Sequence, residues 1–134
     1  MSAQSRKLAR RLAAIPAAVK QAVVPALLKS GEELAARMKH LAPKDTGALA
    51  DSIAVTPPGS STPPYSQPGG SRVAAENQVL VTAGNDGVRY PHLVEHGTAD
   101  APAQPYFWPA YRLSRTRIAN RIKRAARKAV REAT

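Results

Sequence analysis

The residues best suited to chemistry are the histidines and the acid of one short segment. His92 and His96 are four residues apart with Glu95 between them, a spacing that suits a metal pair on a regular helix. The sequence offers no clear third ligand, and the segment lacks the length and the flanks of a metalloprotease helix. We therefore expect no metal here, and we interpret these histidines as polar groups of a surface or an interface.

Other signatures of catalysis or cofactor binding are weaker. The chain has no cysteine, which excludes disulfides and thiolate metal sites and fits assembly in a cytoplasm. Gly69-Gly70-Ser71 has no following lysine and no preceding strand, so it lacks the form of a phosphate-binding loop. No nucleophile and base converge in the sequence pattern. We expect a protein that is not an enzyme and that has no catalytic residue and no cofactor.

The chain is strongly basic, with its cations concentrated near both ends. Its 134 residues include 20 lysines and arginines against 9 acids, a formal net charge of +11. Such a field attracts phosphate whatever the base sequence. Aromatic residues do not alternate with the cations, so base stacking is not expected, and any DNA contact should be with the backbone and should weaken with salt. The alternative is a solvated helix face that keeps an alanine-rich helix soluble. The candidate contacts, with DNA or with an acidic partner, are Arg6, Arg10, Arg11, Arg115, Arg121, Arg124 and Lys128.

Two stretches have the periodicity of amphipathic helices. Apolar residues at spacings of three and four predict a helix over positions 17–42, which should pack on a sheet. Pro25 removes one backbone donor inside it, so we expect a kink or a break near Val24. A separate short helix is predicted over positions 5–15. A last helix is predicted from position 105 or 109 to 133, with a basic outer face. Its inner face should carry Phe107, Tyr111, Ser114, Ile118, Ile122, Ala125 and Ala129.

The middle of the chain predicts strands and a long loop. Positions 53–56 start a strand that Pro57-Pro58 ends. Positions 57–72 hold five prolines, three glycines and four serines, which predicts a loop that stays mobile until a partner holds it, or else a tolerated insertion without consequence. Positions 78–82 and 88–90 flank an Asn-Asp-Gly turn and predict a hairpin.

These elements predict one α+β domain over residues 1–134. A small antiparallel sheet should be packed by the long N-terminal helix and by the basic C-terminal helix, with the loop at 57–72 outside them. No run of about 18 apolar residues occurs, so no segment should span a membrane. Four of the six aromatic residues, Tyr90, Tyr106, Phe107 and Trp108, fall in two short clusters, where contacts should converge.

Ordered motifs in the chain resemble those of a family of small tail components from long-tailed bacteriophages. One motif covers positions 42–53 and contains Pro43, Thr46 and Gly47. The second covers positions 90–98 and 103–110, and it is similar to the family's "valine-glutamate-aromatic-glycine-threonine" and "alanine-x-proline-phenylalanine-x-x-proline-alanine" signature. His96 stands where an aromatic residue is commoner. The resemblance covers nearly the whole chain except the loop at 57–72.

The resemblance implies a structural protein of the virion neck, similar in role to the lambda-type minor tail protein Z, which joins the finished tail to the DNA-filled head. It implies a closed homo-oligomeric ring around the DNA channel, with other neck and tail proteins as partners and assembly in the host cytoplasm. The main alternative is a free protein that binds double-stranded DNA without sequence specificity through its basic terminal helices.

The same resemblance implies roles for individual residues. Gly97 would permit a tight backbone turn, Glu95 would accept hydrogen bonds from backbone or from an arginine, and Thr98 would cap the turn. Phe107, Trp108 and Tyr111 would anchor the terminal helix to the sheet. The residues expected at a subunit or partner interface are Glu95, His96, Gly97, Thr98, Pro105, Tyr106, Phe107, Trp108 and Pro109.

Overall fold

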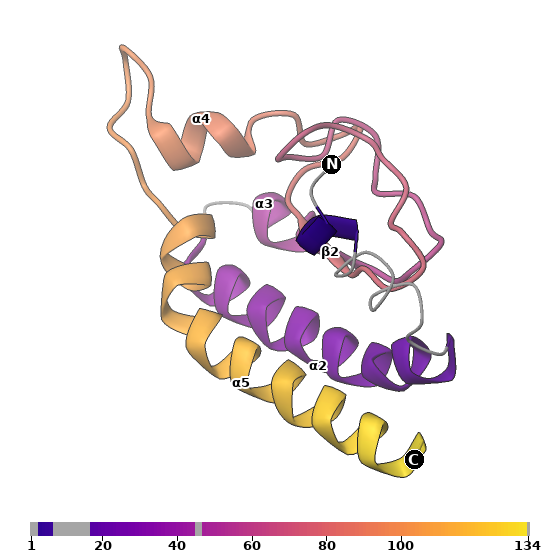
Figure 1. Cartoon of the computed structure of the whole chain (residues 1–134). Coiled ribbons are helices and arrows are strands. Elements are labelled where there is room, and N and C mark those ends of the chain that lie inside the picture. The colour runs from indigo at the N-terminus through magenta and orange to yellow at the C-terminus, as the bar shows by residue number, and fades with distance from the viewer. Residues whose placement is uncertain (1–2, 7–16, 45–46, 134) are drawn as a thin grey trace.

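The computed structural model describes residues 3–6, 17–44 and 47–133, and helices dominate it (Figure 1). Two strands form a small antiparallel sheet, so the mixed α+β class is confirmed. Residues 3–6 are helical, and the rest of the short helix predicted at 5–15 lies outside the described residues. The elements are α2 (Ala17–Leu41), α3 (Ala48–Asp51), β1 (Ala54–Thr56), β2 (Leu80–Thr82), α4 (Pro91–His96) and α5 (Phe107–Ala133).

Helix α2 has nearly the bounds that its apolar periodicity predicts, but it does not break at Pro25. The helix is continuous through this residue, so a break near Val24 is excluded, while the alternative, a kink, stays a prediction. A proline inside a helix removes one backbone hydrogen bond, and this local loss is opposed by packing along both sides of α2. Helix α2 packs along α5, and near Pro25 the two helices line a common pocket, with Pro25 on one side and Ala125 and Ala129 on the other.

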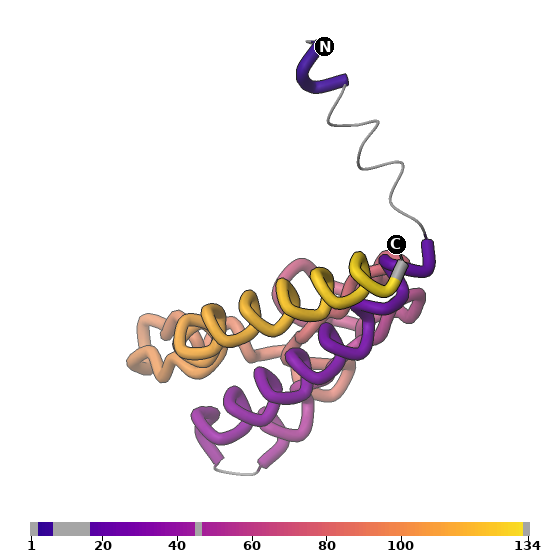
Figure 2. The backbone as a smooth tube through the Cα atoms, turned by 60° about the horizontal axis from the view of Figure 1, so that its bottom comes forward, coloured from indigo at the N-terminus to yellow at the C-terminus, as the bar shows by residue number. Residues whose placement is uncertain are grey.

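Helix α2 lies between the sheet and α5. A Cβ atom built on Gly31 would meet Cγ1 of both Val55 and Val79 at 3.0 Å, so the α2 backbone approaches the sheet closely at this glycine. On its other side α2 packs along α5, which runs in the opposite direction (Figures 1 and 2). The buried core joins these layers through Leu34, Ala35, Met38, Ala42, Leu49, Ile53, Ala83, Val88, Tyr106, Phe107 and Ala110.

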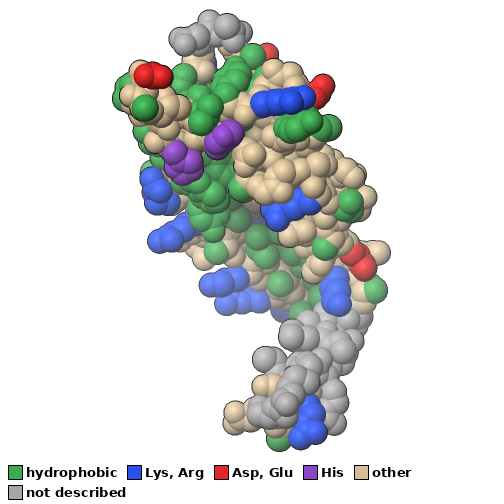
Figure 3. All heavy atoms as spheres, turned by 90° about the horizontal axis from the view of Figure 1, so that it is seen from above, with side chains coloured by type: hydrophobic (Ala, Val, Ile, Leu, Met, Phe, Trp, Pro, Cys, Tyr) green, Lys and Arg blue, Asp and Glu red, His purple; other side chains and the backbone are tan. Residues whose placement is uncertain are grey.

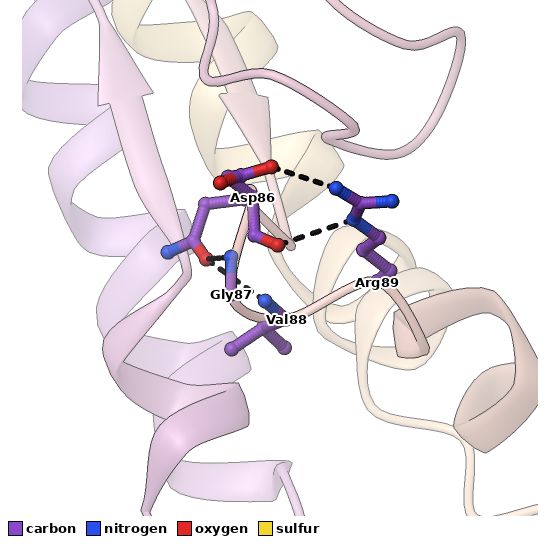
Figure 4. Close-up of polar contacts among 5 residues, drawn as sticks. Asp86, Gly87, Val88 and Arg89 are labelled. Atoms are coloured by element: carbon purple, nitrogen blue, oxygen red, sulfur yellow. Dashed lines mark hydrogen bonds and ion pairs between the residues drawn. The ribbon is translucent and has the colours of Figure 1, made fainter.

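The predicted hairpin at 78–90 is wrong in its return strand. β2 pairs with β1, from Ala54 opposite Thr82 to Thr56 opposite Leu80. The turn itself forms, because the Asn85 side-chain oxygen accepts hydrogen bonds from the N–H groups of Gly87 at 2.9 Å and Val88 at 3.0 Å (Figure 4). Beyond this turn the chain enters α4, whose first residue is a proline, a residue well suited to a helix start.

The loop at 57–72 has more internal contacts than its composition suggests. The N–H of Thr62 donates to the Arg72 carbonyl at 2.8 Å, and Gln67 exchanges backbone hydrogen bonds of 2.7 and 3.0 Å with Ala83 next to β2. The Arg89 guanidinium lies 3.7 Å from the centre of the Tyr65 ring. Contacts within the chain therefore tie this loop to the end of the sheet and to the turn before α4.

Candidate functional site

The carboxylate of Glu95 caps the start of α5 from the neighbouring helix α4. Its Oε1 accepts hydrogen bonds from the N–H groups of Tyr106 at 3.0 Å and Phe107 at 2.8 Å, and its Oε2 accepts a longer one of 3.4 Å from Trp108. The first N–H groups of a helix have no acceptor within the helix, and negative charge is favourable at that end. Glu95 is only 8% exposed, so this acid holds α4 against α5 from inside the fold.

Gly97 and Thr98 turn the chain out of α4 into the loop that leads to α5. Gly97 has φ +78°, and a Cβ atom there would lie 2.7 Å from the backbone nitrogen of Ala103. The Thr98 hydroxyl accepts hydrogen bonds from the N–H groups of Asp100 at 3.2 Å and Ala101 at 3.1 Å. These contacts and the cap confirm the folding roles that the resemblance implied for the glutamate, the glycine and the threonine.

The aromatic residues at the start of α5 divide into a buried pair and an exposed pair. Tyr106 and Phe107 are buried in the core, and burial, reinforced by the charge of Glu95, raises the pKa of the Tyr106 hydroxyl. Trp108 is 40% exposed and Tyr111 is 42% exposed, with their rings edge to face at 6.1 Å. The expectation that Trp108 and Tyr111 anchor α5 to the sheet is therefore wrong. At this end of α5 the core contacts come from Phe107 and Ala110 of the helix and from Tyr106 just before it, while Ile118 packs against the same core further along the helix.

The exposed ring of Trp108 lies beside the two histidines of α4, and the Tyr111 ring lies against Trp108. A pocket of about 70 Å³ is lined by His92, His96 and Trp108, together with the Gln67-Pro68 turn of the long loop. Figure 3 shows histidine side chains among apolar ones on the side of the molecule that carries α4. We call His92, His96, Trp108 and Tyr111 the aromatic face. Within the described residues no group of three or more metal-ligating side chains occurs at this face or elsewhere.

The remaining residues expected at an interface have different exposures. Thr98 and Pro105 are exposed, Gly97 and Pro109 are half-buried, and Glu95, Tyr106 and Phe107 face the interior. Tyr111 was not among the expected interface residues, and His92 was expected only as a polar group of a surface or an interface. Their spacing relative to His96 and Trp108, one helical turn in each case, was the signal that could have indicated them.

Two arginines of α5 bind α2. Arg121 donates to Glu33 at 2.7 Å and to the Ser30 hydroxyl at 3.2 Å, and its side chain is only 12% exposed. Arg117 lies 3.5 Å from the same glutamate. The hydrogen bond from Arg121 is the main cause that lowers the pKa of Glu33. Arg121, an expected partner contact, thus connects the two long helices.

The other expected cationic contacts lie at the surface where they are described. Arg6, Arg115, Arg124 and Lys128 are exposed, and Lys128 has Glu132 at 4.0 Å. Arg10 and Arg11 lie outside the described residues.

A family model described as "Bacteriophage HK97-gp10, putative tail-component" matches residues 6–97 of the chain. The match covers α2, the sheet and α4, and it ends at the glycine that follows the Glu95 cap. No curated protein and no solved structure matches the chain. Over the part of the chain that the structure describes, no helix has the length and apolar character needed to cross a membrane.

Proposed function

The chain belongs to the HK97-gp10-like family of bacteriophage tail components, and on this premise we propose that it completes the tail at the virion neck as a ring of identical subunits around the DNA channel. Membership makes the chain a structural tail component that acts with other tail proteins in the virion. Its place at the neck, the ring, and assembly in the host cytoplasm are the parts that we propose.

The observation that carries the proposal is the aromatic face. Energetically important interface residues are enriched in tryptophan and tyrosine and tend to lie beside pockets. Trp108 and Tyr111 each expose about two fifths of their surface. Trp108 lines the pocket with His92 and His96, and the Tyr111 ring lies edge to face against the Trp108 ring. A folded subunit in isolation gains little from leaving two large rings in water, so this surface is suited to a protein partner.

The Glu95 cap gives this face a fixed geometry. The two short hydrogen bonds that Glu95 accepts from Tyr106 and Phe107 hold the start of α5 against α4, so the rings and the histidines keep their relative positions before any partner binds. Preorganisation of this kind reduces the entropy lost on association. In a ring of more than two copies the interface is heterologous, and the aromatic face must therefore meet a different surface of the next copy.

Sedimentation of the purified chain tests the ring. We expect a single species of several subunits, which the double variant Trp108→Ala, Tyr111→Ala converts to monomer while its circular dichroism stays unchanged. Leu113→Ala is the matched control, because Leu113 is a large exposed residue on another side of α5. A parent chain that stays monomeric at every concentration, or a control that dissociates like the double variant, contradicts the proposed ring contact.

A further inference from the structure

Helix α5 divides into an aromatic start and a cationic remainder. Its only aromatic residues are Phe107, Trp108 and Tyr111, while positions 112–133 carry nine lysines and arginines and one acid, Glu132. A protein interface usually has apolar or aromatic anchors at its centre, whereas a phosphate-binding surface needs dense positive charge. The two parts of α5 therefore suit different partners.

The cations of α5 also divide by direction. Arg117 and Arg121 point to Glu33 on α2, while Ser114 and Ala129 are buried against the rest of the fold. At about 100° per residue, Arg112, Lys123 and Arg127 fall on the opposite side of the helix, within a sector of roughly 60°. Arg124 flanks them, and all four side chains are exposed. We call Arg112, Lys123, Arg124 and Arg127 the basic face.

We propose that the basic face of α5 binds the phosphate backbone of duplex DNA without sequence preference. The face extends from Arg112 to Arg127, 15 residue steps along the helix or roughly 22 Å at the rise of an α-helix. Arginine forms paired hydrogen bonds with phosphate oxygens, and three of the four residues are arginine. Single strands are poorer ligands because the basic face has no ring on which a base could stack.

This DNA contact rests on the proposed function, since the DNA that the basic face binds would be the DNA in the neck channel. An acidic protein surface is a less suitable occupant than DNA. The large exposed rings of α5 lie at the other end of the helix, on the aromatic face. The large exposed apolar residues on the side of the basic face are Leu113 and Val130, which are 17 positions apart, and positions 123–127 between them carry three cations. A surface that carries dense positive charge and little exposed apolar area is suited to binding phosphate groups, whereas a specific protein interface usually has an apolar centre.

The test measures the affinity of the full chain for a labelled duplex of random sequence. Fluorescence anisotropy gives this affinity at each of a series of salt concentrations. Each phosphate contact contributes about −0.9 to the slope of log affinity against log salt. The triple variant Lys123→Ala, Arg124→Ala, Arg127→Ala should lower the magnitude of that slope by roughly 2.7. Alanine has the highest helix propensity, so α5 should remain helical, and circular dichroism checks this.

A control triple with the same loss of charge is Lys39→Ala, Lys44→Ala, Arg72→Ala, three exposed cations outside α5. It should keep most of the parent's slope. The inference is overturned if the parent does not bind duplex at low salt, if both triples lose the slope equally, or if a poly-glutamate peptide binds as tightly as DNA. Sedimentation of the same proteins separates the two proposals. A monomer that still binds DNA through the basic face contradicts the proposed ring but not the proposed DNA contact.

Discussion

Replacing Glu95 with alanine removes the acceptor that the structure gives to the backbone N–H groups of Tyr106 and Phe107. A buried donor left without a partner costs about 1–3 kcal/mol, so two such donors set a range of about 2–6 kcal/mol. The third contact, at 3.4 Å, adds little. Water can reach the site from the adjacent pocket of about 70 Å³, which favours the lower half of the range. We therefore expect Glu95→Ala to lower the free energy of unfolding by about 2–4 kcal/mol.

Glu95→Gln separates hydrogen bonding from charge. Both short hydrogen bonds share Oε1, and a glutamine carbonyl in the same place can still accept them. The variant loses mainly the negative charge at the start of α5, a loss of roughly 1–2 kcal/mol for a partly buried group. We therefore expect glutamine to lie between the parent and alanine.

Urea unfolding at one fixed protein concentration measures all three proteins, because subunit association changes apparent stability. The matched control is Glu32→Ala, an exposed acid on α2, which should change stability by less than about 0.5 kcal/mol. The reasoning fails if Glu95→Ala is no more harmful than this control. It also fails if glutamine is as harmful as alanine, since the backbone hydrogen bonds would then contribute nothing measurable.

Two further changes test neighbouring contacts. Gly97→Ala should lower the free energy of unfolding more than Gly59→Ala does. Both glycines have positive φ, but only a Cβ atom at Gly97 would meet backbone, the nitrogen of Ala103 at 2.7 Å. Equal urea midpoints for the two variants would contradict that close approach. Glu33→Gln should destabilise the fold at neutral pH, because Arg121 lowers the pKa of Glu33 from its ordinary 4.5. A carboxyl whose pKa is lowered on folding stabilises the fold at pH values above its unfolded-state pKa, and this contribution is lost as the pH falls through its folded-state pKa. The difference in unfolding free energy between Glu33→Gln and the parent should therefore shrink below pH 4.5 when urea unfolding is repeated over a series of pH values. A free-energy difference that stays constant down to about pH 3 refutes the role of the ion pair.

The long helices were predictable from the sequence because their apolar periodicity continues over many turns. Helix α4 was not, since six residues are too few to show a period and positions 88–90, just before it, resembled the start of a return strand. The pairing of β2 with β1 joins residues more than twenty positions apart, and no local pattern specifies such a partner. The contacts of the loop at 57–72 could not be predicted from the sequence for a different reason. They are backbone and hydroxyl hydrogen bonds, which an estimate based on apolar content does not count.

The candidate site was predictable in its residues more than in its geometry. The family resemblance implied that Glu95 would accept hydrogen bonds from backbone or from an arginine, but not that the donors would be Tyr106 and Phe107 at the entry to α5, eleven and twelve positions away. It also placed Tyr106 and Phe107 at an interface, whereas the structure buries them. A pattern of aromatic residues indicates where contacts converge, and only the packing decides which rings remain exposed.

The most direct test of the central claim is electron microscopy of particles made by the phage that encodes this chain after its gene is deleted. We expect separate DNA-filled heads and tails, and joined virions once the purified parent chain or Leu113→Ala is added. The double variant Trp108→Ala, Tyr111→Ala should not restore joining. Joined, infectious virions in the absence of the chain, or full restoration by the double variant, would contradict the claim that this protein completes the tail through its aromatic face.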